Sequence, residues 1–226
     1  MAAADPSNAG WQRDLAVSLG RIGQVLREQG KLDEALVSYR AEFVIAERLA
    51  AADPSNADRQ RDLAVSHERI GHVLRDQDKL DEALAILRAG FVIAERLAAA
   101  DPTNSVRQHD LGASHIMVGD VLRKQGKLDE ALASLRAGFV IAERLAAADP
   151  NNAGWQRDLA VSHGRVSLTY RDLGKPAEAL AGFRKGRQRM VAAAAMTPGV
   201  AQWQQDLAWF DEEIAALERQ MQTAQQ

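Results

Sequence analysis

The sequence predicts an all-α fold, a solenoid of antiparallel helix pairs, and three observations lead to this prediction. A sixteen-residue segment, LRAGFVIAERLAAADP, occurs identically at 87–102 and 135–150. Proline-containing pairs keep the same step of 48 residues, at Asp5-Pro6, Asp53-Pro54, Asp101-Pro102, Asp149-Pro150 and Thr197-Pro198. Helix-favouring Ala, Leu, Arg, Glu and Gln dominate, whereas aromatic residues make up only 5%. A period of roughly 20–50 residues is typical of arrays whose units bury their apolar faces against their neighbours.

The 48-residue step predicts one repeat array over residues 1–226 rather than separate globular domains. We place the repeats at about 5–52, 53–100, 101–148 and 149–196, followed by a C-terminal capping helix at about 197–226. Residues 1–5 align with Leu49–Asp53, the last turn of a helix. We therefore expect the chain to be a segment cut from, or evolved from, a longer array.

The first helix of each pair is predicted from its cap and its apolar period. Ser7 and Asn8 are candidate N-caps. Apolar residues then recur at steps of three and four, which is one face of an amphipathic helix: Trp11, Leu15, Leu19, Ile22 and Leu26. Gly30 supplies the left-handed residue that ends the helix.

The second helix begins with Asp33-Glu34, whose negative charge suits the positive end of the helix dipole. Its buried stripe is predicted to contain Leu32, Ala35, Leu36, Tyr39, Phe43, Ala46 and Leu49. Pro54 prevents the helix from continuing.

The same predictions apply at the equivalent positions of the later repeats. First helices are expected near 8–29, 56–77, 104–125 and 152–173, and second helices near 31–52, 79–100, 127–148 and 175–195. A ninth helix, near 200–223, keeps the first-helix pattern and then becomes polar at Asp211, Glu212, Glu213 and Glu218. We expect it to be a terminal cap whose polar side faces solvent.

The helix pair resembles the motif of the tetratricopeptide repeat family over nearly the whole chain. The first repeat carries the motif as Ile22-Gly23, Gly30, Ala35, Tyr39 and Pro54, and the later repeats match at equivalent positions. The family's usual unit is about 34 residues, so each helix here is about two turns longer while its buried face keeps its direction. The resemblance implies a right-handed superhelix whose concave groove, lined mainly by the first helices, binds a peptide or a helix of another protein.

Two kinds of position would line that groove. The positions that vary between repeats are Gly20, Glu68, Ile116 and Gly164 and, one turn on, Gln24, His72, Asp120 and Leu168. Beside them runs a constant row, Arg27, Arg75, Arg123 and Arg171, whose guanidinium groups could bind carboxylates in a partner. The alternatives are neutral drift at the variable positions and, for the arginines, local pairing with carboxylates such as Glu28, Asp76 or Asp172. The candidate partner-binding residues are Gln24, Arg27, Glu68, His72, Arg75, Ile116, Asp120, Arg123, Leu168 and Arg171.

Two other sets of repeated residues suggest a ligand site but are better explained by packing. His67, His115 and His163 recur at the period, yet imidazoles one repeat apart are too distant to share a metal bond of about 2 Å. Trp11, Trp155 and Trp203 are interpreted as anchors of the helix start. We expect no metal site, no cofactor and no catalytic residue, because neither a nucleophile elbow nor a phosphate loop is present.

The helix at 175–195 departs most from the repeat. Arg184, Lys185, Arg187 and Arg189 replace apolar positions there, and such a basic patch could touch RNA or an acidic partner. These charges are spread around the helix without interleaved aromatic residues, which favours a solvated face beside the cap.

Composition sets the remaining expectations. The net charge of −3 gives no broad attraction to nucleic acid or anionic lipid, so nucleic acid is an improbable partner. The absence of cysteine, of a signal peptide and of an apolar run of about 18 residues predicts a cytoplasmic protein that does not enter the membrane. The sequence thus predicts a non-catalytic scaffold that binds a protein or peptide ligand. Self-association through the array ends, a spacer role in a larger regulatory protein, and RNA binding through the basic helix are the alternatives.

Overall fold

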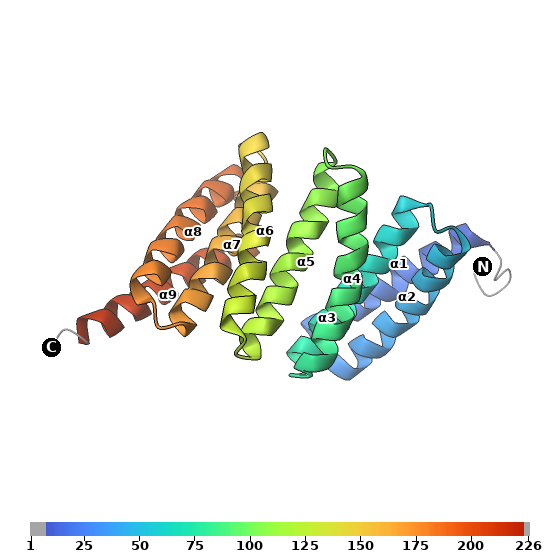
Figure 1. Cartoon of the computed structure of the whole chain (residues 1–226), viewed down its shortest axis with the longest axis horizontal. Helices are drawn as coiled ribbons and strands as arrows, with labels where there is room; N and C mark the ends of the chain where they lie inside the picture. The colour runs from blue at the N-terminus through green and yellow to red at the C-terminus, as the bar shows by residue number, and fades with distance from the viewer. Residues whose placement is uncertain (1–7, 224–226) are drawn as a thin grey trace. The chain divides into compact units, whose positions relative to one another are not determined.

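A computed structural model describes residues 8–223 (Figure 1). Over that range the chain forms nine helices and no strand, with each helix end within one residue of its expected position. The helices are α1 (Ala9–Glu28), α2 (Leu32–Ala52), α3 (Ala57–Asp76), α4 (Leu80–Ala100), α5 (Ser105–Lys124), α6 (Leu128–Ala148), α7 (Ala153–Asp172), α8 (Pro176–Met196) and α9 (Ala201–Thr223). The expectations for residues 1–5, for Pro6 and for the Ser7 cap lie outside the described residues.

Asparagine caps start the first helix of the pairs. The Asn8 side chain accepts a hydrogen bond from the Trp11 backbone N–H, and Asn152 accepts one from that of Trp155. Asn56 does the same for two backbone N–H groups of α3. Each cap satisfies donors that have no partner inside the helix, and therefore fixes where the helix begins.

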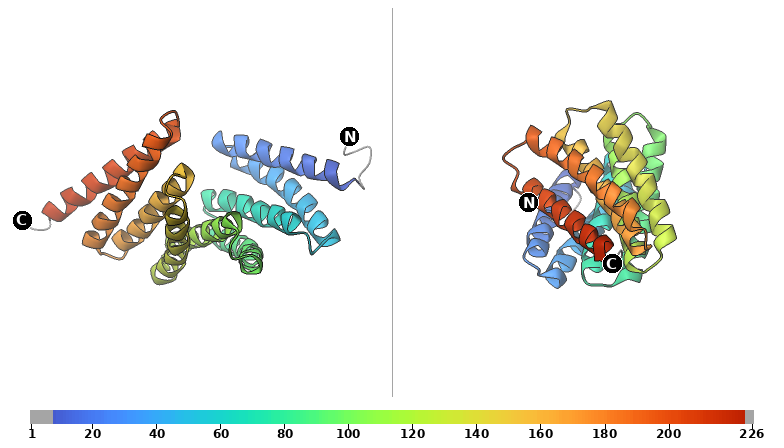
Figure 2. Two further views of the ribbon diagram at one scale, coloured as in Figure 1. Left: turned by 90° about the horizontal axis from the view of Figure 1, so that it is seen from above. Right: turned by 90° about the vertical axis from the view of Figure 1, so that its left-hand side faces the viewer.

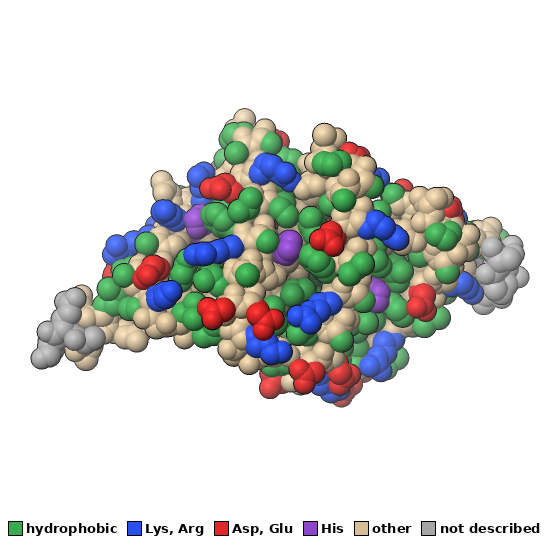
Figure 3. All heavy atoms as spheres, viewed as in Figure 1, with side chains coloured by type: hydrophobic (Ala, Val, Ile, Leu, Met, Phe, Trp, Pro, Cys, Tyr) green, Lys and Arg blue, Asp and Glu red, His purple; other side chains and the backbone are tan. Residues whose placement is uncertain are grey.

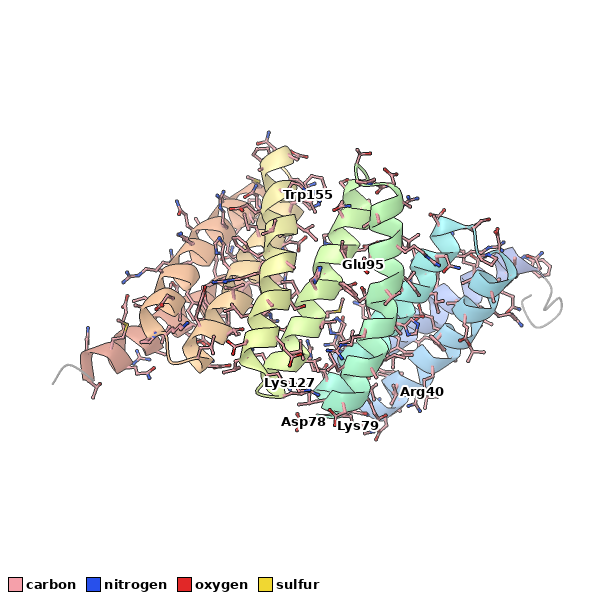
Figure 4. All side chains as sticks on the ribbon, viewed as in Figure 1. Arg40, Asp78, Lys79, Glu95, Lys127 and Trp155 are labelled. Atoms are coloured by element: carbon pink, nitrogen blue, oxygen red, sulfur yellow. The ribbon has the colours of Figure 1, made fainter. Side chains whose placement is uncertain are left out.

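The same helices end in a left-handed residue. Gly30, Gly126 and Gly174 have φ of 76°, 76° and 70°. The Gly30 N–H donates to the Arg27 carbonyl and the Lys31 N–H to the Leu26 carbonyl, which is the Schellman arrangement. In the turn between α3 and α4, Asp78 takes the place of glycine at φ 61° (Figure 4). The turn therefore keeps its geometry even where the sequence departs from the repeat.

The helices divide into two compact units whose boundary falls within α5, after Met117. In the first unit α1 packs on α2, α2 on α3, and α3 on α4 (Figure 2). In the second unit the same order holds from α6 through α7 and α8 to α9. Each unit is thus a stack of antiparallel helix pairs, and the all-α repeat fold is confirmed. A single array over the whole chain stays a prediction.

The core of each unit follows the predicted stripe. Tyr39, Val73 and Leu87 are buried in the first unit, and Leu135 and Phe183 are fully buried in the second. Close approach of the paired helices requires glycine: a Cβ on Gly71 would lie 2.5 Å from the Leu87 side chain. The repeated histidines are packing residues, as expected, because His67 and His163 make edge-on ring contacts with Phe43 and Phe139 at centroid distances of 4.9 and 4.8 Å.

Two expectations are modified by the structure. The acidic side of α9 does not simply face solvent, because Asp211 and Glu218 pair with Arg187 and Arg184 of α8. Two basic residues of α8 are therefore neutralised by two acidic residues of α9. The apolar face predicted for the first helix does form on α1, but Ile22 remains 52% exposed because no helix among the described residues of the first unit covers that side.

Candidate partner-binding cleft

A cleft opens between α1 and α3, the first helices of neighbouring pairs in the first unit. Its volume is about 320 Å³, and α2 forms its floor through Glu42, Ala46 and Leu49. Val17 and Gln24 of α1 line one wall. First helices form the walls and a second helix lies beneath, as the resemblance implied for a groove.

Charged side chains surround the cleft, with more basic than acidic groups. Arg13, Arg21, Arg59 and Arg69 line it, against the carboxylates Asp62 and Glu42. The excess of guanidinium groups favours a ligand that carries negative charge.

Some of these charges are already paired within the first unit. The Arg13 Nε lies 2.8 Å from Asp62 Oδ2, across the gap from α1 to α3. Arg69 pairs with Glu42, whose other oxygen, Oε2, is buried without a hydrogen-bond partner. Burial raises the pKa of Glu42, while the charge of Arg69 and its hydrogen bond act in the opposite direction.

The Arg13–Asp62 pair belongs to a pattern that joins consecutive first helices. Arg61 donates to Asp110 in the first unit, and Arg157 pairs with Asp206 at 2.9 Å in the second. Each arginine reaches an aspartate 49 residues later, because all the first helices carry aspartate at one repeat position and α1, α3 and α7 carry arginine directly before it. These bonds are partly exposed, so each contributes about 0–1 kcal/mol and serves mainly to align the helices.

The constant arginine row adopts a similar pattern near the other end of these helices. Arg27 pairs with Asp76 at 2.8 Å, and Arg123 pairs with Asp172 at 2.7 Å. Arg171 pairs with Glu213. In α3, Arg75 pairs with Asp76 of its own helix, because Lys124 stands at the next aspartate position. The arginines therefore have carboxylate partners, and a ligand at this row would compete with them.

The other candidates occupy different surroundings. In the first unit, Gln24 lines the cleft, whereas His72 and Ile116 are half-buried outside its lining. In the second unit, Leu168 lies in the hydrophobic core, and buried Asp120 lies 3.3 Å from Arg165. The ten candidates are thus not gathered into one pocket within either unit.

Glu68 is the candidate with the most unusual environment. Its Oε1 accepts a hydrogen bond of 2.7 Å from Ser114, and it lines a small enclosed space beside Arg61 and Asp110. Burial raises the pKa of Glu68 to about 7, although the hydrogen bond from Ser114 opposes this shift. This carboxyl group therefore changes charge near neutral pH.

Sequence reasoning missed most of the cleft lining, namely Arg13, Val17, Arg21, Glu42, Asp62 and Arg69. The sequence did contain a signal for part of this lining, since the pair Arg-Asp recurs at 13–14, 61–62 and 157–158. Nothing in the sequence paired Glu42 with Arg69, because glycine holds the place of Glu42 in every later repeat, at Gly90, Gly138 and Gly186.

A second hollow, of about 600 Å³, lies between α2 and α4 in the first unit. Phe43, Val44, Ile70 and Leu74 make its lining more apolar than that of the cleft. On the face drawn in Figure 3, apolar side chains are interspersed with basic and acidic ones, and neither charge gathers into a patch. The convergent arginines thus distinguish the cleft between α1 and α3.

Among residues 8–223, no group of three or more His, Cys, Asp or Glu side chains is placed to hold a metal ion. No helix in that range combines the length and apolar character needed to cross a membrane.

No protein-family model and no curated protein matches the chain. Several solved structures, in contrast, are similar to the chain. BtubC from P. vanneervenii gives a TM-score of 0.60 at 11% sequence identity, over 99% of this chain and 85% of its own length. Aspartyl phosphate phosphatase F from Bacillus subtilis gives 0.63 at 11% identity, over 94% of this chain and 51% of its own length.

The Rap conjugation gene regulator of the plasmid pLS20, in complex with the Phr* peptide, gives a TM-score of 0.54 at 16% identity. The match covers 88% of this chain and 52% of the regulator, so the chain spans about half the length of this protein and of the phosphatase. Similarity at such low identity concerns the fold alone. The chain shares an all-helical repeat fold with these proteins.

Proposed function

We propose that the chain is a non-catalytic protein-interaction scaffold, a long-helix variant of the tetratricopeptide repeat with a 48-residue unit. Its cleft between α1 and α3 binds an acidic segment of a partner protein. The observation that carries this proposal is the cleft itself, in which four arginines face two carboxylates. A partner carboxylate would find guanidinium donors there, and apolar contacts with Val17 and Leu49 would add affinity.

The fold supports a peptide ligand in particular. The Rap regulator of pLS20, which shares the fold, was solved in complex with a peptide. Long parallel walls such as α1 and α3 suit an extended segment or one helix, which offers side chains at regular intervals. We propose Gln24, which lines the cleft, and the Arg27 row as further contacts that exchange their present carboxylate partners for those of the ligand; of that row, Arg27 and Arg75 lie on the two helices that form the walls.

RNA binding through α8 is the weaker candidate. Arg184 and Arg187 already pair with Glu218 and Asp211 of α9, which neutralises half of the four basic residues. A protein partner and RNA are distinguished by treating the cell extract with nuclease before capture.

The proposal is tested by capture of partners from nuclease-treated extract with wild type, Val17→Glu and Val92→Glu. Both valines are exposed, at 44% and 61%, but only Val17 lines the cleft. A carboxylate at position 17 would occupy the arginines and repel an acidic ligand. We expect a partner that binds wild type and Val92→Glu and is lost with Val17→Glu.

Equal capture by all three proteins would refute the assignment of the cleft. Capture of nothing by any of them would leave the spacer role as the better account. Circular dichroism of each variant verifies that the helices are intact.

A further inference from the structure

The outer side of α1 presents an apolar face that later repeats keep covered. Ile22 and Val25 are 52% and 51% exposed, whereas Ile70 and Val73, one repeat later in α3, are 4% and 0% exposed. In α3 this side packs on α2, the helix before it. Among the described residues of the first unit, 8–117, no helix takes that place beside α1 (Figure 2). Trp11 and Leu15 extend the exposed face to most of the length of the helix.

Two charged residues flank this face. Their counterparts in α3 both pair with the preceding repeat: Asp62 with Arg13, and Arg69 with Glu42. In α1 the equivalent residues are Asp14 and Arg21, and neither forms a salt bridge within the described range. The outer side of α1 therefore offers an apolar stripe together with one acidic and one basic group.

The order of these residues is close to symmetrical about Ser18. Trp11 and Val25 lie seven residues before and after it, and Leu15 and Ile22 lie three before and four after. When two copies of α1 pair antiparallel, Trp11 of one copy faces Val25 of the other, and Leu15 faces Ile22. Residues spaced alternately by three and four are the seam that two helices bury between them.

The charges follow the same symmetry with opposite sign. Asp14 lies four residues before Ser18 and Arg21 three residues after it. Antiparallel pairing brings Asp14 of each copy to Arg21 of the other, whereas parallel pairing places equivalent charges on opposite edges of the seam and forms neither pair. We propose that two copies of this chain associate through α1 as an antiparallel, twofold-symmetric dimer centred on Ser18.

Among the described residues, the second helices of a second copy are not available for this place. The side of each second helix that would fit α1 is already occupied in its own repeat. Phe43, Phe91 and Phe139 contact histidines of the following helix, and α8 packs on α9. The free α1 face of the second copy remains, and a twofold pairing of like faces closes at two chains.

Sedimentation equilibrium over a wide concentration range tests the dimer. We expect wild type to form a dimer, Ile22→Glu to remain a monomer, and Val92→Glu to behave as wild type. Both substitutions replace exposed apolar residues, so neither should unfold the chain. A wild-type monomer at millimolar concentration would overturn the proposal, and so would a mass that rises beyond two chains.

Charge exchange tests the pairing. Asp14→Arg and Arg21→Asp alone each set like charges together, and we expect each to weaken the dimer about tenfold or more. A mixture of the two variants restores both attractions and should form a heterodimer. The absence of a heterodimer would contradict the pairing of Asp14 with Arg21. The mass of the dimer is measured in the absence of any partner protein. The outcome of the charge exchange is therefore independent of the test of the cleft.

Introduced cysteines test the orientation, since the chain has none of its own. Ser18→Cys lies at the proposed twofold axis and should form a disulfide-linked dimer under mild oxidation. Val25→Cys should not, because antiparallel pairing keeps the two copies of position 25 roughly 20 Å apart along the helix. Efficient linkage through Val25→Cys would show parallel pairing and refute the proposal.

Discussion

At the scale of single residues, Asp78 holds the least favourable backbone conformation in residues 8–223. It is the non-glycine residue there with positive φ, at the place where the other repeats have glycine. Left-handed geometry costs an L-residue energy that glycine avoids. We expect Asp78→Gly to raise the free energy of unfolding by about 0.5–1 kcal/mol.

Gly126→Asp is the reciprocal test. No atom lies within 4 Å of a Cβ built on Gly126, so only the backbone conformation opposes substitution there. It should lower the free energy of unfolding by a similar amount, as measured by urea denaturation. An equal change of the same sign in both variants would show that conformation does not select glycine at this turn.

Glu68 gives the fold a pH dependence near neutrality. Its pKa in the folded chain is about 7, above the ordinary value of 4.5. Its contribution to stability is therefore complete below pH 4.5 and is lost as the pH rises through 7. Between pH 4.5 and 8 the wild type should lose at most about 3 kcal/mol relative to Glu68→Gln, which cannot ionise.

Comparison with Glu68→Gln at each pH separates Glu68 from other titrating groups. Burial lowers the pKa of His67, His115 and His163, so these side chains destabilise the fold at acid pH instead. Arg61, Asp110 and His109 lie near Glu68 in both proteins and their effects cancel to first order. If the free energy of unfolding changed with pH in the same way for wild type and for Glu68→Gln, a raised pKa of Glu68 would be excluded.

At the scale of the helix, burial decides which positions matter. Leu135 and Val140 both lie on α6, but Leu135 is 0% exposed and Val140 is 61% exposed. Leu135→Ala leaves a cavity in the second unit and should cost about 2–5 kcal/mol of unfolding free energy. Val140→Ala removes a solvated side chain and should change stability by about 0.5 kcal/mol or less. Thermal and urea denaturation of both variants would show whether the stripe is the core, since similar losses would contradict it.

The helices were predictable because their limits are local. Asparagine caps, Gly30 and the Pro54 stop act through the few residues beside them, so the sequence alone places each helix end. The pairing of α8 with α9 depends on register between helices. The basic residues of α8 could therefore be recognised as a break in the repeat, but not matched to Asp211 and Glu218.

The cleft was predictable only in outline. The resemblance indicated a groove walled by first helices, and Gln24 does line a cleft between two of them, but its role as a partner contact stays a prediction. Arg13 and Asp62 are 49 residues apart and Glu42 and Arg69 are 27 apart, distances that become contacts only through packing. Leu168 illustrates the reverse case, since a variable position in the repeat proved to be part of the core of the second unit.

At the scale of the whole molecule, repetition produces surfaces that differ only where the repeat is broken. Glycine stands at the place of Glu42 in the later repeats, and α1 is the first helix that no described helix of the first unit covers on its outer side. The candidate cleft and the dimer face therefore both lie at α1. They use adjoining sides of that helix, since Val17 lines the cleft, Ile22 does not, and Arg21 borders both.

The central claim is that a partner protein occupies the cleft, and site-specific photo-crosslinking tests it most directly. A photoreactive residue would replace Val17 in one protein and Val92 in another, because both side chains are exposed. We expect the captured partner to crosslink at position 17 and not at position 92. Crosslinking at position 92 alone, or equally at both, would contradict the account.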